Sequence, residues 1–167
     1  MTVPISSQTL YAHATVITVN AKREIILDGA ILINGNEIAA IDKTPNLVSV
    51  LSNDATIVDC SNKIIIPGLI NTHVHLVQSL MRGLAEDLPL YSWLCDAIWK
   101  LEANLREDDG YIAAKLTIAE MLKSGTTCFL EAMMTHQANI DNVVRAVGEM
   151  GIRACLVGNA ISTMKYN

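Results

Sequence analysis

The sequence predicts an α/β protein of two parts, a small β-rich region over residues 1–66 and a region of alternating strands and helices over residues 67–167. Three observations predict this. Short apolar runs and an Asn-Gly turn fill the first part, the step Pro67-Gly68 interrupts the chain, and strand-length apolar runs then alternate with apolar stripes of helical spacing. Strands separated by helices pair in parallel through right-handed crossovers, so the second part is either a (β/α) barrel or an open doubly wound sheet.

The β-rich part contains three stretches with strand character. Residues 14–19 and 55–59 are short apolar runs, and residues 29–41 alternate in polarity about an Asn34-Gly35-Asn36 turn. An Asn-Gly step between alternating apolar residues is a strong hairpin signal. We therefore expect a small antiparallel sheet, with too few strands to close well.

The second part begins with Leu69–His75, an apolar run rich enough in branched residues for a buried strand. A helix is expected after it, because an apolar stripe recurs at spacings of three and four residues, and Asp87 and Pro89 are suited to its start. The stripe consists of Leu90, Leu94, Ile98, Leu101 and Leu105.

Further helices and strands then alternate. Asp108 or Asp109 is suited to cap the next helix, Ser124-Gly125 stops it, and Gly151 stops the helix after that. The elements expected here are a helix over residues 109–123, a strand over 126–130, a helix over 141–150 and a strand over 152–157.

Composition excludes several classes of partner. The net charge is −5 and no run of Lys or Arg occurs, which argues against a nucleic-acid partner, since phosphate binding needs clustered cations. No apolar run reaches the roughly 18 residues of a membrane-helix candidate. The N-terminus has neither the basic region nor the apolar core of a secretion signal, so we expect a cytoplasmic protein.

The first strand of the second part ends in two histidines, His73 and His75. Side chains in a strand repeat every two residues, so both imidazoles are expected on one side, where they can share a metal at about 2.0–2.1 Å per bond. Ligands bind at the carboxyl ends of strands in both candidate folds, and no glycine-rich dinucleotide loop follows this strand. A histidine in an apolar strand is more often a satisfied core residue, and two ligands do not complete a tetrahedral site.

Two segments resemble a known family. "KIIIPGLINTHVHL" at residues 63–76, followed by "AEMLKSGTTCFLE" at residues 119–131, is similar to the opening of the amidohydrolase superfamily. The likeness is to the branch with guanine deaminase, S-adenosylhomocysteine deaminase and the s-triazine hydrolases, and it covers nearly the whole chain. It implies a metal-dependent hydrolase on a (β/α)8 barrel, of which this chain holds about three strands, with residues 1–66 as the N-terminal half of a composite β-sandwich.

The resemblance also implies the chemistry. His73 and His75 carry over as ligands of one divalent metal ion, zinc or iron, and the remaining ligands and acid/base groups are expected beyond Asn167. The implied reaction is hydrolysis of a carbon–nitrogen bond, the deamination of a nucleobase-like or triazine-like heterocycle by a hydroxide on the metal. The implied partner is this small molecule, and family habit favours a homo-oligomer for the full-length form.

Three residues are candidates for substrate binding. Gln78 follows the histidines, and its amide can donate and accept hydrogen bonds at a ring edge, although a water-facing loop position is the alternative. Trp93 is a candidate aromatic wall or a core residue. His136 lies after the second strand as a candidate pocket residue or a solvated loop residue, and for Glu131, which ends that strand, a packing or loop role is equally plausible.

Two alternatives to a ring deaminase stay open. A cyclic amidase of the dihydroorotase or hydantoinase kind shares the His-x-His pair but typically has a following arginine, where this chain has Leu76, Val77 and Gln78. The other alternative is a catalytically silent, truncated amidohydrolase-like subunit, because a (β/α)8 barrel needs about 250 residues.

Overall fold

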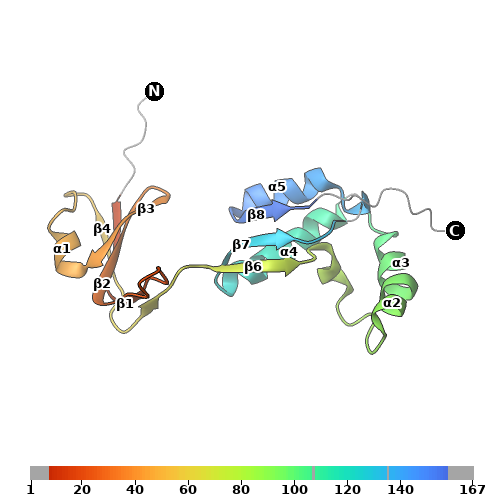
Figure 1. Ribbon diagram of the computed structural model, residues 1–167. Helices are drawn as coiled ribbons and strands as arrows, with labels where there is room; N and C mark the ends of the chain where they lie inside the picture. Colours follow the sequence, from red (N-terminus) through yellow and green to blue (C-terminus); the bar gives the residue numbers. More distant parts are fainter. Residues whose placement is uncertain (1–7, 107, 135, 158–167) are drawn as a thin grey trace, which may run out of the picture. The chain divides into compact units, whose positions relative to one another are not determined.

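The protein forms two compact units in the computed structural model, Met1–Pro67 and Gly68–Asn167 (Figure 1). The structure describes residues 8–106, 108–134 and 136–157, with the backbone alone at residue 136. Each unit has a β-sheet and a hydrophobic core of its own.

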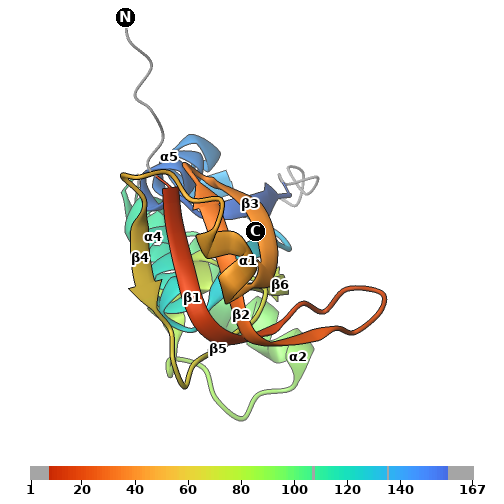
Figure 2. The ribbon, with the colours of Figure 1, turned by 90° about the vertical axis from the view of Figure 1, so that its left-hand side faces the viewer.

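The first unit contains a five-stranded sheet in the order β3-β2-β1-β4, with β5 also paired to β1 (Figure 2). The pairs β1–β2 and β2–β3 are antiparallel, and β4 and β5 run parallel to β1. The elements are β1 (Gln8–Ile17), β2 (Ile25–Asn34), β3 (Glu37–Lys43), α1 (Thr44–Val48), β4 (Thr56–Asp59) and β5 (Ile64–Ile65).

The predicted hairpin is confirmed, because Asn34 pairs with Glu37 across a turn in which Gly35 has a φ of 64°. Two expectations were wrong. β1 begins at Gln8, earlier than residue 14, and β4 and β5 pair in parallel. The chain between β3 and β4 includes α1 and returns to the end of the sheet at which β1 begins. Because β4 starts at the same end as β1, the two strands run parallel.

The second unit has the parallel sheet that the sequence predicts, with strand order β6-β7-β8 among the described residues. Helices α4 and α5 lie on one side of it (Figure 1). Buried side chains of the helices and of β7, including Ile118, Val143 and Phe129, form the core between the layers. The elements are β6 (Leu69–Val74), α4 (Asp109–Lys123), β7 (Thr126–Glu131), α5 (Ile140–Met150) and β8 (Arg153–Leu156).

The predicted helix stops are confirmed, since Gly125 and Gly151 adopt φ values of 86° and 69° after α4 and α5. The prediction that an aspartate side chain caps α4 was wrong. Asp108 makes no side-chain capping bond, and Asp109 instead accepts a hydrogen bond of 2.7 Å from the backbone N–H of Arg106. No helix in the described ranges is long and apolar enough to cross a membrane.

The helix expected after the first strand is present but irregular. A 3-10 helix, η1 (Val77–Met81), comes first, and α2 (Leu90–Ser92), the π-helical η2 (Trp93–Ile98) and α3 (Trp99–Glu102) follow. The wider π turn shifts the helical phase, so Ile98 and Glu102 are buried while Leu94 and Leu101 are half-exposed. π turns recur at functional sites because they redirect side chains.

Candidate functional site

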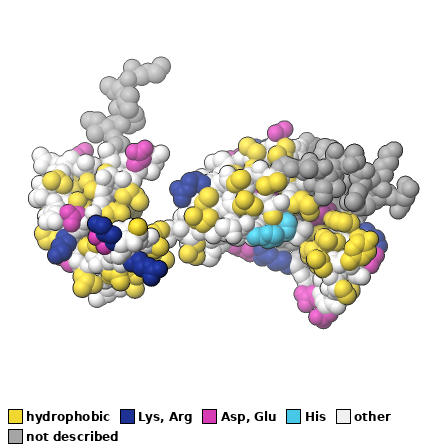
Figure 3. Space-filling model, viewed as in Figure 1, with side chains coloured by type: hydrophobic (Ala, Val, Ile, Leu, Met, Phe, Trp, Pro, Cys, Tyr) yellow, Lys and Arg dark blue, Asp and Glu magenta, His cyan; other side chains and the backbone are white. Residues whose placement is uncertain are grey.

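The two histidines at the end of β6, His73 within the strand and His75 directly after it, lie side by side. The ring centroids of His73 and His75 are 4.9 Å apart, and the ring planes meet at 87°. His73 is exposed and the His75 side chain is 26% exposed. Figure 3 shows histidine side chains at the surface of the second unit, next to apolar residues. The pair is therefore accessible to a ligand from solvent.

An irregularity in β6 produces this arrangement. The register with β7 shifts between Asn71 and Val74, and Asn71 Oδ1 accepts a hydrogen bond of 3.2 Å from the backbone N–H of His73. The ladder resumes where Val74 pairs with Glu131, and the N–H of Ala132 donates to the Val74 carbonyl at 3.0 Å. The histidines thus flank the last paired residue, at the carboxyl end of the strand.

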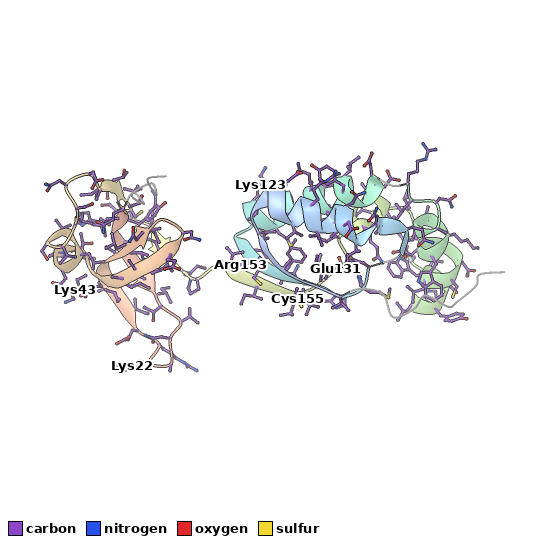
Figure 4. The ribbon with its side chains drawn as sticks, turned by 90° about the horizontal axis from the view of Figure 1, so that it is seen from above. Lys22, Lys43, Lys123, Glu131, Arg153 and Cys155 are labelled. Atoms are coloured by element: carbon purple, nitrogen blue, oxygen red, sulfur yellow. The ribbon has the colours of Figure 1, made fainter. Side chains whose placement is uncertain are left out.

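Glu131 is a buried carboxylate at this end of the sheet, with 1% of its side chain exposed (Figure 4). Its Oε2 accepts a hydrogen bond of 2.6 Å from the backbone N–H of Leu76, and its Oε1 accepts one of 3.1 Å from the N–H of Met133. Oε1 also lies 3.5 Å from Nδ1 of His75. Burial raises the pKa of Glu131, and the two backbone donors and the His75 imidazole offset part of this rise.

Glu102 is a second buried carboxylate, 4% exposed. Its Oε1 accepts a hydrogen bond of 3.0 Å from Nε2 of Gln78, whereas its Oε2 has no hydrogen-bond partner among the described residues. Burial raises the pKa of Glu102; the Gln78 amide and the charge of His75 lower it, and the charge of Glu131 raises it further. Two imidazoles, His73 and His75, and two buried acids, Glu131 and Glu102, thus lie near one another at the end of β6.

The three predicted substrate residues lie in different surroundings. Gln78 is in η1 and donates to Glu102, so it does not simply face water. Trp93 begins η2 and is half-buried, and no described polar or ring contact joins it to the two histidines. His136 begins η3 (His136–Ala138), and its side chain lies outside the described residues.

Sequence reasoning missed Glu102. A signal was present, because this acid follows Ile98 by four residues and so shares the buried face of the same helical segment. The role of Glu131 was left open. No local pattern identifies its bond to Leu76, which lies 55 residues earlier in the chain.

The histidine pair suits a divalent metal ion in its donor chemistry. Neutral imidazole nitrogens are ligands of zinc and iron, and the two rings lie 4.9 Å apart at the surface, with His73 exposed and the His75 side chain 26% exposed. Within the part of the chain that the structure describes, no three His, Cys, Asp or Glu side chains are grouped so that they hold a metal among themselves. The described residues therefore offer two ligands.

The sequence also matches a family model, described as the amidohydrolase family, over residues 64–167. This is more than half of the chain and includes both histidines and both buried acids. The chain belongs to the amidohydrolase family. The resemblance seen in the sequence is thereby confirmed.

Relatives in the amidohydrolase family are deaminases by name. A 5'-deoxyadenosine deaminase of Methanococcus aeolicus is 46% identical over 129 residues, which are 75% of this chain and 29% of the relative. A 5-methylthioadenosine/S-adenosylhomocysteine deaminase of Nitratidesulfovibrio vulgaris is 38% identical over 158 residues, 95% of this chain and 34% of the relative. The chain spans about a third of the length of these relatives.

A solved structure agrees in fold. An adenosine deaminase from Xanthomonas campestris with bound zinc superposes with a TM-score of 0.80 at 30% identity, over 89% of this chain and 33% of that one. Together with the family match, this likeness confirms the predicted fold class, an amidohydrolase barrel represented by its first strands and preceded by a small β-sheet.

Proposed function

We propose that this chain is part of a metal-dependent deaminase that hydrolyses a carbon–nitrogen bond of a nucleoside-like or nucleobase-like heterocycle. The observation that carries the proposal is the pair of imidazoles, with centroids 4.9 Å apart, at the carboxyl end of β6 in an amidohydrolase-family chain. The names of the relatives support the reaction, because they are deaminases of adenosine-type nucleosides.

His73 and His75 are the proposed metal ligands. Zinc is favoured over iron by the zinc in the similar Xanthomonas structure. A divalent ion lowers the pKa of bound water to about 7 and so supplies a nucleophile near neutral pH. The remaining ligands and the proton-transfer groups are proposed to come from the full-length protein beyond Asn167.

Glu102 is the proposed contact for the polar part of the substrate. Its Oε2 is a buried acceptor with no hydrogen-bond partner in the described part of the chain, and such an acceptor gains most from a donor that a ligand brings. The hydroxyl groups of a nucleoside are such donors. Gln78 holds the other oxygen of this carboxyl in place, so the predicted role of Gln78 becomes substrate positioning through Glu102. Trp93, as a candidate aromatic wall, and His136 are retained in the proposal as substrate-binding residues.

The proposal extends to the setting of the protein. It comprises a homo-oligomeric, cytoplasmic enzyme whose partner is its small-molecule substrate, with neither nucleic acid nor membrane as a partner. The net charge of −5 supports the exclusion of nucleic acid.

Metal content and ammonia release test the proposal together. The purified protein is loaded with zinc, and ammonia is measured with 5'-deoxyadenosine, 5'-methylthioadenosine, adenosine and guanine. His73→Ala and His75→Ala are each expected to remove most of the bound zinc and to lower turnover by more than the roughly 10–100-fold that outer-shell changes cost.

His13→Asn is the matched control, since His13 belongs to the first unit and asparagine tolerates its φ of 64°. His13→Asn is expected to keep the bound zinc and the rate of ammonia release. Unchanged zinc in the two β6 variants contradicts the proposal. Zinc that binds without ammonia release from any of these substrates favours the catalytically silent subunit instead.

A further inference from the structure

Glu131 is buried beside a proposed metal ligand without being placed to bind the metal itself. Both of its oxygens are already engaged by backbone donors, Leu76 N–H at 2.6 Å and Met133 N–H at 3.1 Å. These two bonds come from the segments that follow β6 and β7, so the carboxylate is fixed between the ends of the two strands. A carboxylate held in this way has a defined position relative to the His75 ring.

The atom of His75 that lies nearest to Glu131 is its ring nitrogen Nδ1. Nδ1 of His75 is buried and has no hydrogen bond among the described residues, and Glu131 Oε1 lies 3.5 Å from it. This separation is a few tenths of an ångström longer than a normal hydrogen bond, so a small rotation of the imidazole closes it. The backbone N–H groups that donate to both oxygens favour the ionised form of Glu131, and an ionised carboxylate only accepts, so the imidazole presents a protonated Nδ1 to it.

We propose that Glu131 is a positioning residue for His75, which selects the Nδ1–H tautomer and leaves the lone pair of Nε2 free for a metal ion. The inference rests on the proposed function, in which His75 is a metal ligand. Carboxylates that accept from the second nitrogen of a ligating histidine fix both its tautomer and its ring orientation. Glu131 thereby links the folding of the β6–β7 pair to the geometry of the site.

The first test needs no metal and no variant of Glu131. Nitrogen chemical shifts of the histidine rings are recorded by NMR on the metal-free protein labelled with ¹⁵N, and the His75 signals are assigned by their loss in His75→Ala. A protonated Nδ1 and an unprotonated Nε2 are expected at a pH where the ring is neutral. The opposite tautomer overturns the proposal, whether or not zinc binds.

The second test changes the acceptor. In Glu131→Gln the amide oxygen is expected to keep the shorter bond from Leu76 N–H, so that the NH₂ group replaces Oε1, gives up the longer bond from Met133 N–H and faces His75. Nδ1 then becomes the acceptor and the ring proton moves to Nε2, where it competes with the metal. The zinc dissociation constant, measured by competition with a chelator, is expected to rise about 10–100-fold.

Thr117→Val is the matched control for a merely structural effect. Thr117 Oγ1 donates to the Leu76 carbonyl at 3.1 Å and is buried at the same strand end, but no described contact joins it to His75. This variant is expected to loosen the strand end while keeping the His75 tautomer and zinc affinity. An equal loss of affinity in Thr117→Val, or unchanged affinity in Glu131→Gln, contradicts the positioning role. If His75→Ala also leaves zinc binding unchanged, the proposed metal site itself fails.

Discussion

Nε2 of Gln78 donates a hydrogen bond of 3.0 Å to Oε1 of Glu102, while Oε2 of the same buried carboxylate has no partner among the described residues. A buried acid that is half-satisfied destabilises the fold that contains it. Such an acid is retained where a ligand supplies the missing hydrogen bond, because binding sites commonly lower the stability of the unbound protein. This relationship between stability and binding is open to test.

We expect Glu102→Gln to stabilise the metal-free protein at pH 8, because it removes the desolvated charge and keeps the shape of the side chain. The gain in the free energy of unfolding is about 1 kcal/mol, read from urea titrations. Substrate affinity is expected to fall in the same variant. Glu120→Gln serves as the comparison, since Glu120 is exposed and pairs with Arg82 at 2.6 Å, and solvent screens this pair so that its loss changes stability little. A Glu102→Gln variant that is less stable than the unaltered protein argues against this account.

The same carboxyl predicts a pH dependence. Burial raises the pKa of Glu102 above 4.5, its ordinary value, so the folded state holds the proton to higher pH than the unfolded state. Its contribution to stability is therefore full below about pH 4.5 and is lost as pH rises through the folded pKa. The stability difference between Glu102→Gln and the unaltered protein is expected to be small at pH 4 and to grow toward pH 8. A constant difference across this range contradicts the raised pKa.

Two glycines of the second unit are expected to respond in opposite ways to alanine. A Cβ at Gly110 meets the carbonyl oxygen of Ala138 at 2.0 Å, which is backbone and has little room to shift, so Gly110→Ala is expected to cost about 1–3 kcal/mol or more. A Cβ at Gly148 meets no atom of the described residues within 4 Å, and Gly148→Ala in α5 is expected to add about 0.5–1 kcal/mol. Thermal unfolding midpoints distinguish the two. Equal midpoints for both variants exclude close packing of α4 against η3.

Local chemistry explains which elements were predictable from the sequence. The bounds of α4, residues 109–123, are those expected, because Ser124-Gly125 ends a continuous apolar stripe. The hairpin at Asn34-Gly35 and the proximity of the two histidines also follow from short-range rules. Each of these features depends on residues only a few positions apart.

The features that the sequence did not predict depend on distant contacts. The π turn over Trp93–Ile98 has the same apolar spacing as an ordinary helix, and only packing distinguishes the two. The parallel pairing of β4 with β1 depends on where α1 places the returning chain. At the site, the bonds from Leu76 N–H to Glu131 and from Gln78 to Glu102 join residues that lie far apart in the sequence, so only the fold brings them together.

The start of α5 gives the last prediction. Asn139 has a φ of 53°, and its Oδ1 accepts a hydrogen bond of 3.1 Å from the N–H of Asp141, so this residue combines a left-handed backbone with a side-chain cap. Asn139→Gly keeps the backbone freedom and is expected to cost a few tenths of a kcal/mol. Asn139→Ala loses both features and is expected to cost about 1–2 kcal/mol in urea unfolding.

Asn139→Asp separates the two contributions, because an aspartate keeps the accepting oxygen and places a negative charge at the positive end of the α5 dipole. It is expected to match or slightly exceed the stability of the unaltered protein at pH 7. If Asn139→Ala and Asn139→Gly have the same free energy of unfolding, the left-handed backbone adds no cost for alanine, and Asn139 stabilises α5 through its side chain alone.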